Sequence, residues 1–181
     1  MIRAITFETD RFLIHGFRAE ELGRFDSLAT EVFRILSDDH TLRYLPSKRL
    51  RNVNEAKVFL QGMLLNFHAG RSFLHFITDK ASGKVVGMID LISPALAMEH
   101  YRIPRYPFFL EFYLGSFATG CYLMTEVLPA MVSEFLDQGV DCIGAVVDRQ
   151  NIPAKKVLKK ARFSRSCSFD TLQDLYELKV A

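Results

Sequence analysis

The residues of this chain that are best suited to chemistry follow a strand-like run. The stretch 109–126 predicts a strand that passes through a turn of small residues into the first turn of a helix. Up to four backbone N–H groups at a helix start have no partner within the helix, and the helix dipole adds partial positive charge there. A phosphate can therefore bind at such a point without a dedicated cation. We expect the chemistry of the chain to begin at this junction.

Hydrophobic periodicity predicts the elements that hold this junction in place. Helices are expected at 19–36, 55–67, 122–136 and 153–160, with Asn54 as the N-cap of the second and a kink or a local break at Pro129 in the third. Strands are expected at 11–17, 72–78, 84–92, 108–114, 140–148, 166–172 and 175–180, the second and third pairing antiparallel across a short turn. No repeat or linker-like segment interrupts the chain. The pattern predicts one mixed α/β domain over 1–181.

Composition limits the classes of function. The formal net charge is +2, which does not indicate a nucleic-acid partner. The three cysteines, Cys121, Cys142 and Cys167, are far apart and form no Cys-x-x-Cys pair, so we expect neither a disulfide framework nor a metal site. No apolar run approaches the ~18 residues of a membrane span, and residues 1–10 lack the apolar core of a signal peptide. We therefore expect a soluble, cytoplasmic protein.

Four segments carry a family resemblance. Thr-Asp-Arg-Phe-Leu-Ile at 9–14 with Arg18, Arg-Tyr-Leu-Pro at 43–46 and Gly-Lys-Val-Val-Gly at 83–87 precede the half of the chain from 108 to 163, which includes Asn-Ile-Pro-Ala at 151–154. In this order they resemble the GNAT superfamily of N-acetyltransferases, and among its branches the RimJ/RimL-like, ribosomal-protein type. The resemblance covers nearly the entire chain.

The resemblance implies a fold and a cosubstrate. The GNAT fold is a twisted, mostly antiparallel sheet, splayed between two central strands and flanked by helices, and acetyl-CoA lies in the gap between those strands. Here the central strands would be 108–114 and 140–148. A bulge near 112–114 would expose backbone groups to the pantetheine arm. The residues implied in acetyl-CoA binding are Phe112, Tyr113, Leu114, Thr119, Gly120, Cys121, Tyr122, Leu123 and Asn151.

The sequence departs from the family pattern at several positions. The family has Gln or Arg, then Gly, then Gly or Ala where this chain has Phe117, Gly120 and Tyr122. A phenol at Tyr122 could crowd the phosphate or donate a hydrogen bond to it. Ala154 stands where the branch often has Ser, and Leu158 stands where other branches carry a Tyr acid. The family's usual proton donors are therefore missing.

Acetyl transfer to an amine needs an oxyanion donor and a route for protons. We expect the backbone N–H around Tyr113 and Leu114 to stabilise the oxyanion. Glu111 is the first candidate for the base, followed by His100 and Glu99 in an irregular stretch before the strand, and the candidates for the acid are Ser116 and Tyr122.

Each of these residues also has a structural alternative. Glu111 could instead pair with an Arg, Tyr122 could pack on its helix, and Asn151 could act as the N-cap of the helix that follows. The lysines at 155–160 could face solvent or meet a phosphate of the cosubstrate. These alternatives stay open at the level of sequence.

The sequence gives the least information about the site that binds the acceptor. The family would line its acceptor groove with 36–50 and 95–106, and the latter has no clear element. Its basic residues, Arg43, Lys48, Arg49 and Arg51, would suit an acidic acceptor or face water. The resemblance implies acetyl transfer to a primary amine, and the resemblance to the RimJ/RimL-like branch implies that this amine is a protein N-terminus. A small-molecule amine acetyltransferase and a degenerate domain that binds acyl-CoA or a peptide without turnover are the alternatives, and an oligomer is possible.

Overall fold

The computed structural model describes residues 2–179, so the predicted strand end at Val180 lies outside the described residues. The strands are β1 Thr6–Glu8, β2 Phe12–His15, β3 Ser72–Asp79, β4 Lys84–Ile92, β5 Phe108–Leu114, β6 Cys142–Asp148, β7 Ser164–Ser168 and β8 Gln173–Lys179. The α-helices are α1 Ala19–Gly23, α2 Phe25–Leu36, α3 Val53–His68, α4 Pro94–His100, α5 Leu123–Asp137 and α6 Ile152–Lys160, and two 3₁₀ turns are η1 Pro46–Lys48 and η2 Ser116–Ala118.

Within the described residues, eight strands form one sheet in the order β1-β2-β3-β4-β5-β6-β8-β7. The pairs β1–β2, β2–β3, β6–β8 and β7–β8 are antiparallel. The pair β5–β6 is parallel and joins Phe108 to Ile143 and Phe109 to Gly144, at the beginning of β5. The predicted mixed α/β fold with a mostly antiparallel sheet is confirmed.

The chain forms two compact units, which are described separately. Unit 2 contains Ala4–Asp90 and Phe112–Cys121. Unit 1 contains residues 2–3, 91–111 and 122–179 of the described chain.

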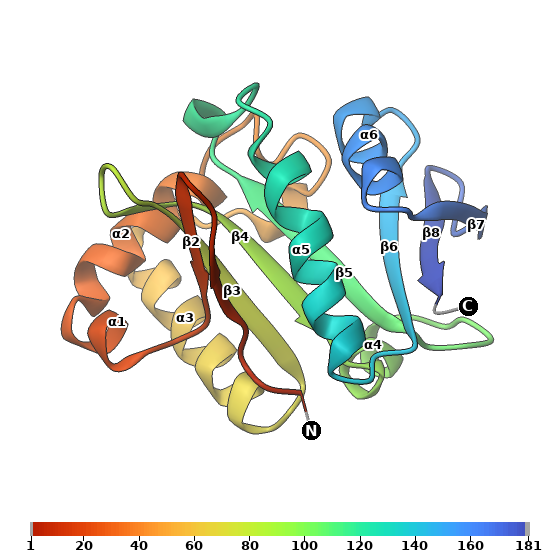
Figure 1. The fold of residues 1–181 in the computed structure, drawn as a ribbon, viewed down its shortest axis with the longest axis horizontal. Helices are drawn as coiled ribbons and strands as arrows, with labels where there is room; N and C mark the ends of the chain where they lie inside the picture. Colours follow the sequence, from red (N-terminus) through yellow and green to blue (C-terminus); the bar gives the residue numbers. More distant parts are fainter. Residues whose placement is uncertain (1, 180–181) are drawn as a thin grey trace. The chain divides into compact units, whose positions relative to one another are not determined.

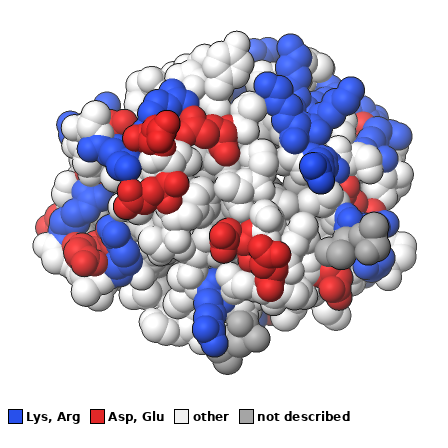
Figure 2. All heavy atoms as spheres, viewed as in Figure 1, with Lys and Arg blue, Asp and Glu red and all other residues white. Residues whose placement is uncertain are grey.

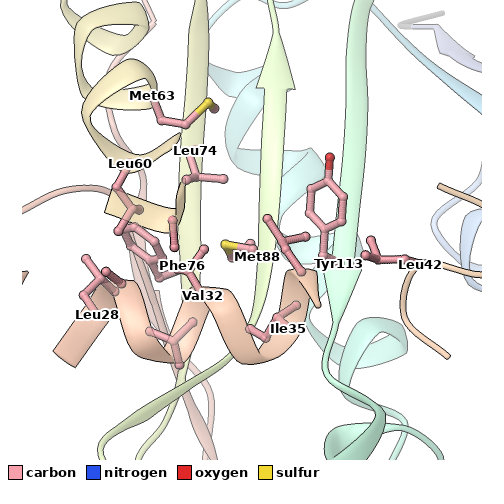
Figure 3. Packing of buried hydrophobic residues seen from close by; sticks show 14 residues of the cluster. Leu28, Val32, Ile35, Leu42, Leu60, Met63, Leu74, Phe76, Met88 and Tyr113 are labelled. Carbon is pink, nitrogen blue, oxygen red and sulfur yellow. The ribbon is translucent and has the colours of Figure 1, made fainter. Parts of the chain in front are cut away.

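The core of unit 2 is built from two helices and the strands beside them. Helices α2 and α3 lie side by side, and α3 packs on β3 (Figure 1). Spacings of three and four residues place Leu28, Val32 and Ile35 on the buried face of α2. Figure 3 shows these side chains meeting Leu60 and Met63 of α3, Leu74 and Phe76 of β3, Met88 of β4 and Tyr113 of β5. The Tyr113 ring therefore anchors the second half of β5 in this core.

A buried carboxylate also ties α2 to β4 in unit 2. Glu31 is 8% exposed and accepts a hydrogen bond from the backbone N–H of Val85 at 3.0 Å. Its carboxylate also binds the Arg24 guanidinium at 3.0 Å and the Ser27 hydroxyl at 3.3 Å. Because a buried charge is tolerated only when it is paired and hydrogen-bonded, these three donors explain why Glu31 can lie inside.

Unit 1 has its own apolar clusters. Helix α5 buries one face along its length, and α6 packs beside it (Figure 1). A second cluster joins Phe109 of β5 to Ile92, Ala97 and Leu175. Helix α5 continues through Pro129, so the proline does not end it.

Several sequence predictions of local structure are wrong. The segment 19–36 is two helices, because Arg24 leaves the helical region at φ −118° and ψ 28°. The N-cap of α3 is Asn52, whose side chain accepts from the N–H of Glu55, whereas Asn54 lies inside the helix. The segment 95–106 contains helix α4, which begins at Pro94 after the Ser93 cap. Strand β1 was not predicted, and the strand expected at 166–172 is Ser164–Ser168.

Candidate active site

Backbone alternation at the end of β5 sets the direction of the groups at 112–115. The N–H of Gly115 donates to the carbonyl of Val86 on β4 at 3.0 Å. The Tyr113 carbonyl also lies against β4, because a Cβ added to Gly87 would come within 2.9 Å of it. Since peptide groups alternate along a strand, the N–H and C=O of Leu114 face away from β4. The absence of a side chain at Gly87 permits this close approach of the two strands.

The outward carbonyl of Leu114 has a side-chain partner. It accepts a hydrogen bond from the hydroxyl of Thr41 at 2.8 Å. The Thr41 backbone N–H donates to the carboxylate of Asp38 at 2.8 Å, and the Ser116 hydroxyl donates to the same carboxylate at 2.5 Å. The two hydrogen bonds from Ser116 and Thr41 hold the pKa of Asp38 below its usual value. The carboxylate therefore stays charged at neutral pH.

The turn after β5 is braced by local and distant contacts, all within unit 2. Both the N–H and the hydroxyl of Thr119 donate to the Ser116 carbonyl, at 3.2 and 2.8 Å. The Cys121 carbonyl accepts from the Arg11 guanidinium at 3.1 Å. Phe117 is exposed, and the Arg34 guanidinium stands 5.1 Å from the centre of its ring. Two guanidinium groups thus lie on the turn that the sequence assigns to phosphate binding.

The start of α5 in unit 1 has no side-chain cap. Its N-cap residue, Tyr122, has a left-handed backbone with φ 60°, and the first helical bond joins the N–H of Glu126 to the Tyr122 carbonyl. Because that bond is the first of the helix, the N–H groups at 123–125 have no partner within it. A non-glycine residue with this φ costs on the order of 1 kcal/mol, which marks Tyr122 as a strained position.

The Tyr122 side chain does not pack on its helix. It is 74% exposed, and the ammonium of Lys160 lies 5.6 Å from the ring centre. Lys160 belongs to a group of four lysines on α6, where basic side chains gather on the surface (Figure 2). The structure therefore favours an exposed phenol at the helix start over the packing alternative.

The predicted proton-transfer residues lie in different settings. Glu111 is half-buried on β5, and the residue takes part in an interaction there. The Ser116 proton is donated to Asp38. Glu99 and His100 are exposed at the end of helix α4, not in an irregular stretch. The structure connects Ser116 to Leu114 through Asp38 and Thr41, two residues that the sequence analysis did not assign to the site.

The segment after β6 in unit 1 confirms one structural alternative. The Asn151 side chain accepts from the N–H of Ala154 at 3.1 Å and so caps α6. Leu158, at the position of the Tyr acid in other branches, is fully buried. No hydroxyl therefore comes from this position.

The two predicted acceptor segments are more ordered than expected. In unit 2, Arg49 bonds the Ser37 carbonyl at 2.8 Å and the Asp39 carboxylate at 2.5 Å, so its charge is used within the segment. In unit 1, the Tyr106 hydroxyl donates to the Tyr101 carbonyl at 2.8 Å and fixes the stretch after α4.

Among residues 2–179, no group of three or more His, Cys, Asp or Glu side chains could hold a metal ion. None of the helices in this range has the length and apolar character needed to cross a membrane.

The order of the strands and helices is that of the GNAT fold. Residues 21–164 match the sequence model of the Acetyltransferase (GNAT) domain, so the chain belongs to this family, and the predicted GNAT acetyltransferase is confirmed. A comparison with curated proteins gives no match.

Solved structures show the same fold at low sequence identity. The ribosomal-protein-S5-alanine acetyltransferase of Vibrio fischeri is 15% identical with a TM-score of 0.72, covering 97% of this chain and 96% of its own. RimL, a ribosomal-protein alpha-N-acetyltransferase in complex with coenzyme A, is 13% identical with a TM-score of 0.70, covering 97% and 98%. The microcin C7 self-immunity acetyltransferase MccE, in complex with acetyl-CoA and AMP, is 14% identical with a TM-score of 0.66, covering 95% and 94%. Two of these three are ribosomal-protein acetyltransferases, the type named by the sequence resemblance.

Proposed function

We propose that this protein is an acetyl-CoA-dependent N-acetyltransferase that acts on a primary amine, and that its acceptor is a protein N-terminal α-amino group. Family membership supports the acetyl transfer. The observation that carries the proposal is the outward N–H of Leu114, which faces away from β4 beside a carbonyl that Thr41 already occupies. Such a fixed donor is what a developing oxyanion requires.

Acetyl-CoA would be held by two neighbouring segments of backbone, at the end of β5 and in the turn that follows it. We assign the pantetheine arm to the backbone of 112–114 and the pyrophosphate to the N–H groups of 119–123. The uncapped start of α5 supports this assignment, because its first N–H groups have no partner within the helix. Gly120, with φ 78°, lies in the turn just before it.

Acetyl-CoA supplies a thioester whose carbonyl carbon is attacked by the amine, and the C–S bond breaks as the thiolate leaves. The Leu114 N–H would stabilise the oxyanion, with Tyr113 fixed in the core behind it. Glu111, directly or through a water, would accept the proton that the amine loses. Because the Ser116 proton is donated to Asp38, Tyr122 is the better candidate for a donor to the thiolate.

An N-terminal acceptor suits this modest set of catalytic groups. An α-amino group with a pKa near 8 is neutral in roughly a tenth of molecules at pH 7, whereas a free lysine is neutral in about one of several thousand. The chain therefore needs less help from a base with an N-terminus than with a lysine. Two of the structural relatives are named for protein substrates, an S5 alanine and a ribosomal protein N-terminus.

A second candidate function is binding of acyl-CoA or a peptide without turnover. Tyr122 favours it, because a bulky residue in a left-handed conformation stands where the family has Gly or Ala. A small-molecule amine is a further possible acceptor. These alternatives predict different products in one assay.

The experiment combines binding and turnover. Acetyl-CoA should raise the melting temperature, and free thiol should appear when peptides with N-terminal Ala or Ser are added. Stabilisation without thiol release across peptides, lysine and polyamines would favour the binding domain. A melting temperature unchanged by acetyl-CoA would refute both. Mass spectrometry of the acetylated peptide, with an N-terminally blocked peptide as control, identifies the nitrogen that is modified.

A further inference from the structure

Three side chains close a ring of hydrogen bonds around Gly115. On one side of Gly115, the Thr41 hydroxyl donates a hydrogen bond to the Leu114 carbonyl. On the other side, the Ser116 hydroxyl donates to the Asp38 carboxylate. The ring closes where Asp38 accepts from the Thr41 N–H. All of these residues belong to unit 2, and we call Asp38, Thr41 and Ser116 the Asp38 latch.

The latch fixes the peptide plane next to the proposed oxyanion donor. Both groups of the Leu114–Gly115 peptide are engaged, the carbonyl by Thr41 and the N–H by Val86. The preceding peptide is held by the approach of the Tyr113 carbonyl to Gly87. With a planar peptide on each side, the direction of the Leu114 N–H has little freedom left.

We propose that the Asp38 latch positions the Leu114 N–H for acetyl transfer, so that Thr41, Asp38 and Ser116 are positioning residues of the reaction. The inference rests on the proposed function. It gives Ser116 a role other than that of an acid, since its hydroxyl proton completes the latch. A charged Asp38 can accept from both Thr41 and Ser116, which a neutral amide at this position cannot do equally well.

The main test removes one hydroxyl. Thr41→Val leaves the Leu114 carbonyl without its donor, and we expect kcat for thiol release from acetyl-CoA to fall ~10- to 100-fold, as for a displaced oxyanion donor. The KM for acetyl-CoA should stay within about twofold, because the latch does not touch the phosphates. Thr41→Ser keeps the hydroxyl and should restore most of kcat, whereas Asp38→Asn should lose activity in the same way as Thr41→Val.

The matched control is Thr30→Val. Thr30 also donates its hydroxyl to a backbone carbonyl, that of Asp26 at 2.9 Å, but on the exposed side of α2. Its kcat should equal that of the wild type. Equal kcat for Thr41→Val and wild type, or an equal loss for Thr41→Ser and Thr41→Val, would overturn the proposal.

A second readout separates the latch from the proposed function. Amide hydrogen exchange at Gly115 should be faster in Thr41→Val than in the wild type, since its peptide has lost one of two anchors. This measurement needs no turnover. Absence of thiol release from the wild type would refute the proposed function, while unchanged exchange at Gly115 in Thr41→Val would overturn the latch itself.

Discussion

Acidification should destabilise this protein through a histidine in the core of unit 2. His75 on β3 is fully buried, and it is hydrogen-bonded as a neutral ring. Its Nδ1 lies 2.7 Å from the Phe73 carbonyl, and its Nε2 accepts from the N–H of Ile5 at 3.0 Å. A proton added at Nε2 would break the bond to Ile5 and bury a charge. Burial accordingly lowers the pKa of His75 from 6.5 to about 4.

The sign and size of the effect follow from proton linkage. The unfolded chain binds the proton near pH 6.5, whereas the folded chain binds it only near pH 4, so stability is full above pH 6.5 and is lost as the pH falls between these values. With 1.36 kcal/mol for each pKa unit, the loss from His75 between pH 7 and pH 4.5 is about 2.5 kcal/mol. That is a large part of a typical stability of roughly 5–15 kcal/mol.

Urea denaturation at pH 7.0 and pH 4.5 measures this difference. His75→Gln can still accept from the Ile5 N–H but does not titrate, so its free energy of unfolding should fall by about 2.5 kcal/mol less than that of the wild type over this interval. His40→Gln, at an exposed position of the same unit, is the control and should follow the wild type. An equal loss in His75→Gln and wild type would show that a different group carries the acid sensitivity.

Three further predictions concern the turn, the strand contact and the buried carboxylate. Gly120→Asp should weaken coenzyme A binding tenfold or more, as measured by calorimetry. Gly120→Ala introduces the same backbone strain without a charge and should weaken binding less. Equal affinities of the two variants for coenzyme A would place the pyrophosphate elsewhere. Gly87→Ala should reduce thiol release at least tenfold, because the added methyl group would displace the Tyr113 carbonyl. The control is Gly62→Ala, in open space on α3, which should raise the free energy of unfolding by up to about 1 kcal/mol and leave thiol release unchanged. A fully active Gly87→Ala enzyme would contradict the strand geometry. Glu31→Ala should lower the free energy of unfolding by about 2 kcal/mol, because it leaves the buried N–H of Val85 without its acceptor and the part-exposed Arg24 guanidinium without its partner. A loss below about 1 kcal/mol in urea would contradict this account.

Elements with a strong apolar period were predictable from the sequence. Strand β5 has the predicted bounds, and α3, α5 and α6 differ from prediction by one or two residues. In the three helices the buried side chains repeat at helical spacing. Strand β5 is instead a short, mostly apolar run bounded by Pro107 and Gly115, which also indicates a strand. Helix α4 was missed although Ser93 and Pro94 form a normal helix start, because the helix has only seven residues and its apolar period is too short to stand out.

The break at Arg24 shows what periodicity cannot detect. Apolar residues continue at helical spacing from α1 into α2, so the pattern reads as one helix. The backbone nevertheless turns at Arg24, whose side chain binds the buried Glu31, while the Arg18 guanidinium holds Glu21 at 2.9 Å before the break. The break therefore depends on which arginine pairs with which glutamate, and the hydrophobic pattern carries no information about ion pairs.

The candidate site was predictable in its backbone part only. The turn after β5 and the start of α5 were identified because small residues and a helix start have local signatures. The latch depends on pairs that are 73 and 78 residues apart, Thr41 with Leu114 and Asp38 with Ser116. Only the link from Asp38 to Thr41 has a local signal, an acceptor side chain three residues before the N–H that it binds.

The departure at Phe117 can be understood from the same structure. The family motif places a Gln or Arg at this position, and by sequence alone the chain has lost a polar or charged side chain there. In the folded chain the Phe117 ring lies under Gly115, since a Cβ at Gly115 would be 2.4 Å from it, and it supports the Arg34 guanidinium of α2 at 5.1 Å. A cation therefore stands at this turn although no residue of the motif provides it. Arg34 and Phe117 are far apart in the sequence, and only the folded chain brings the guanidinium within reach of the ring. The motif alone therefore does not reveal this cation.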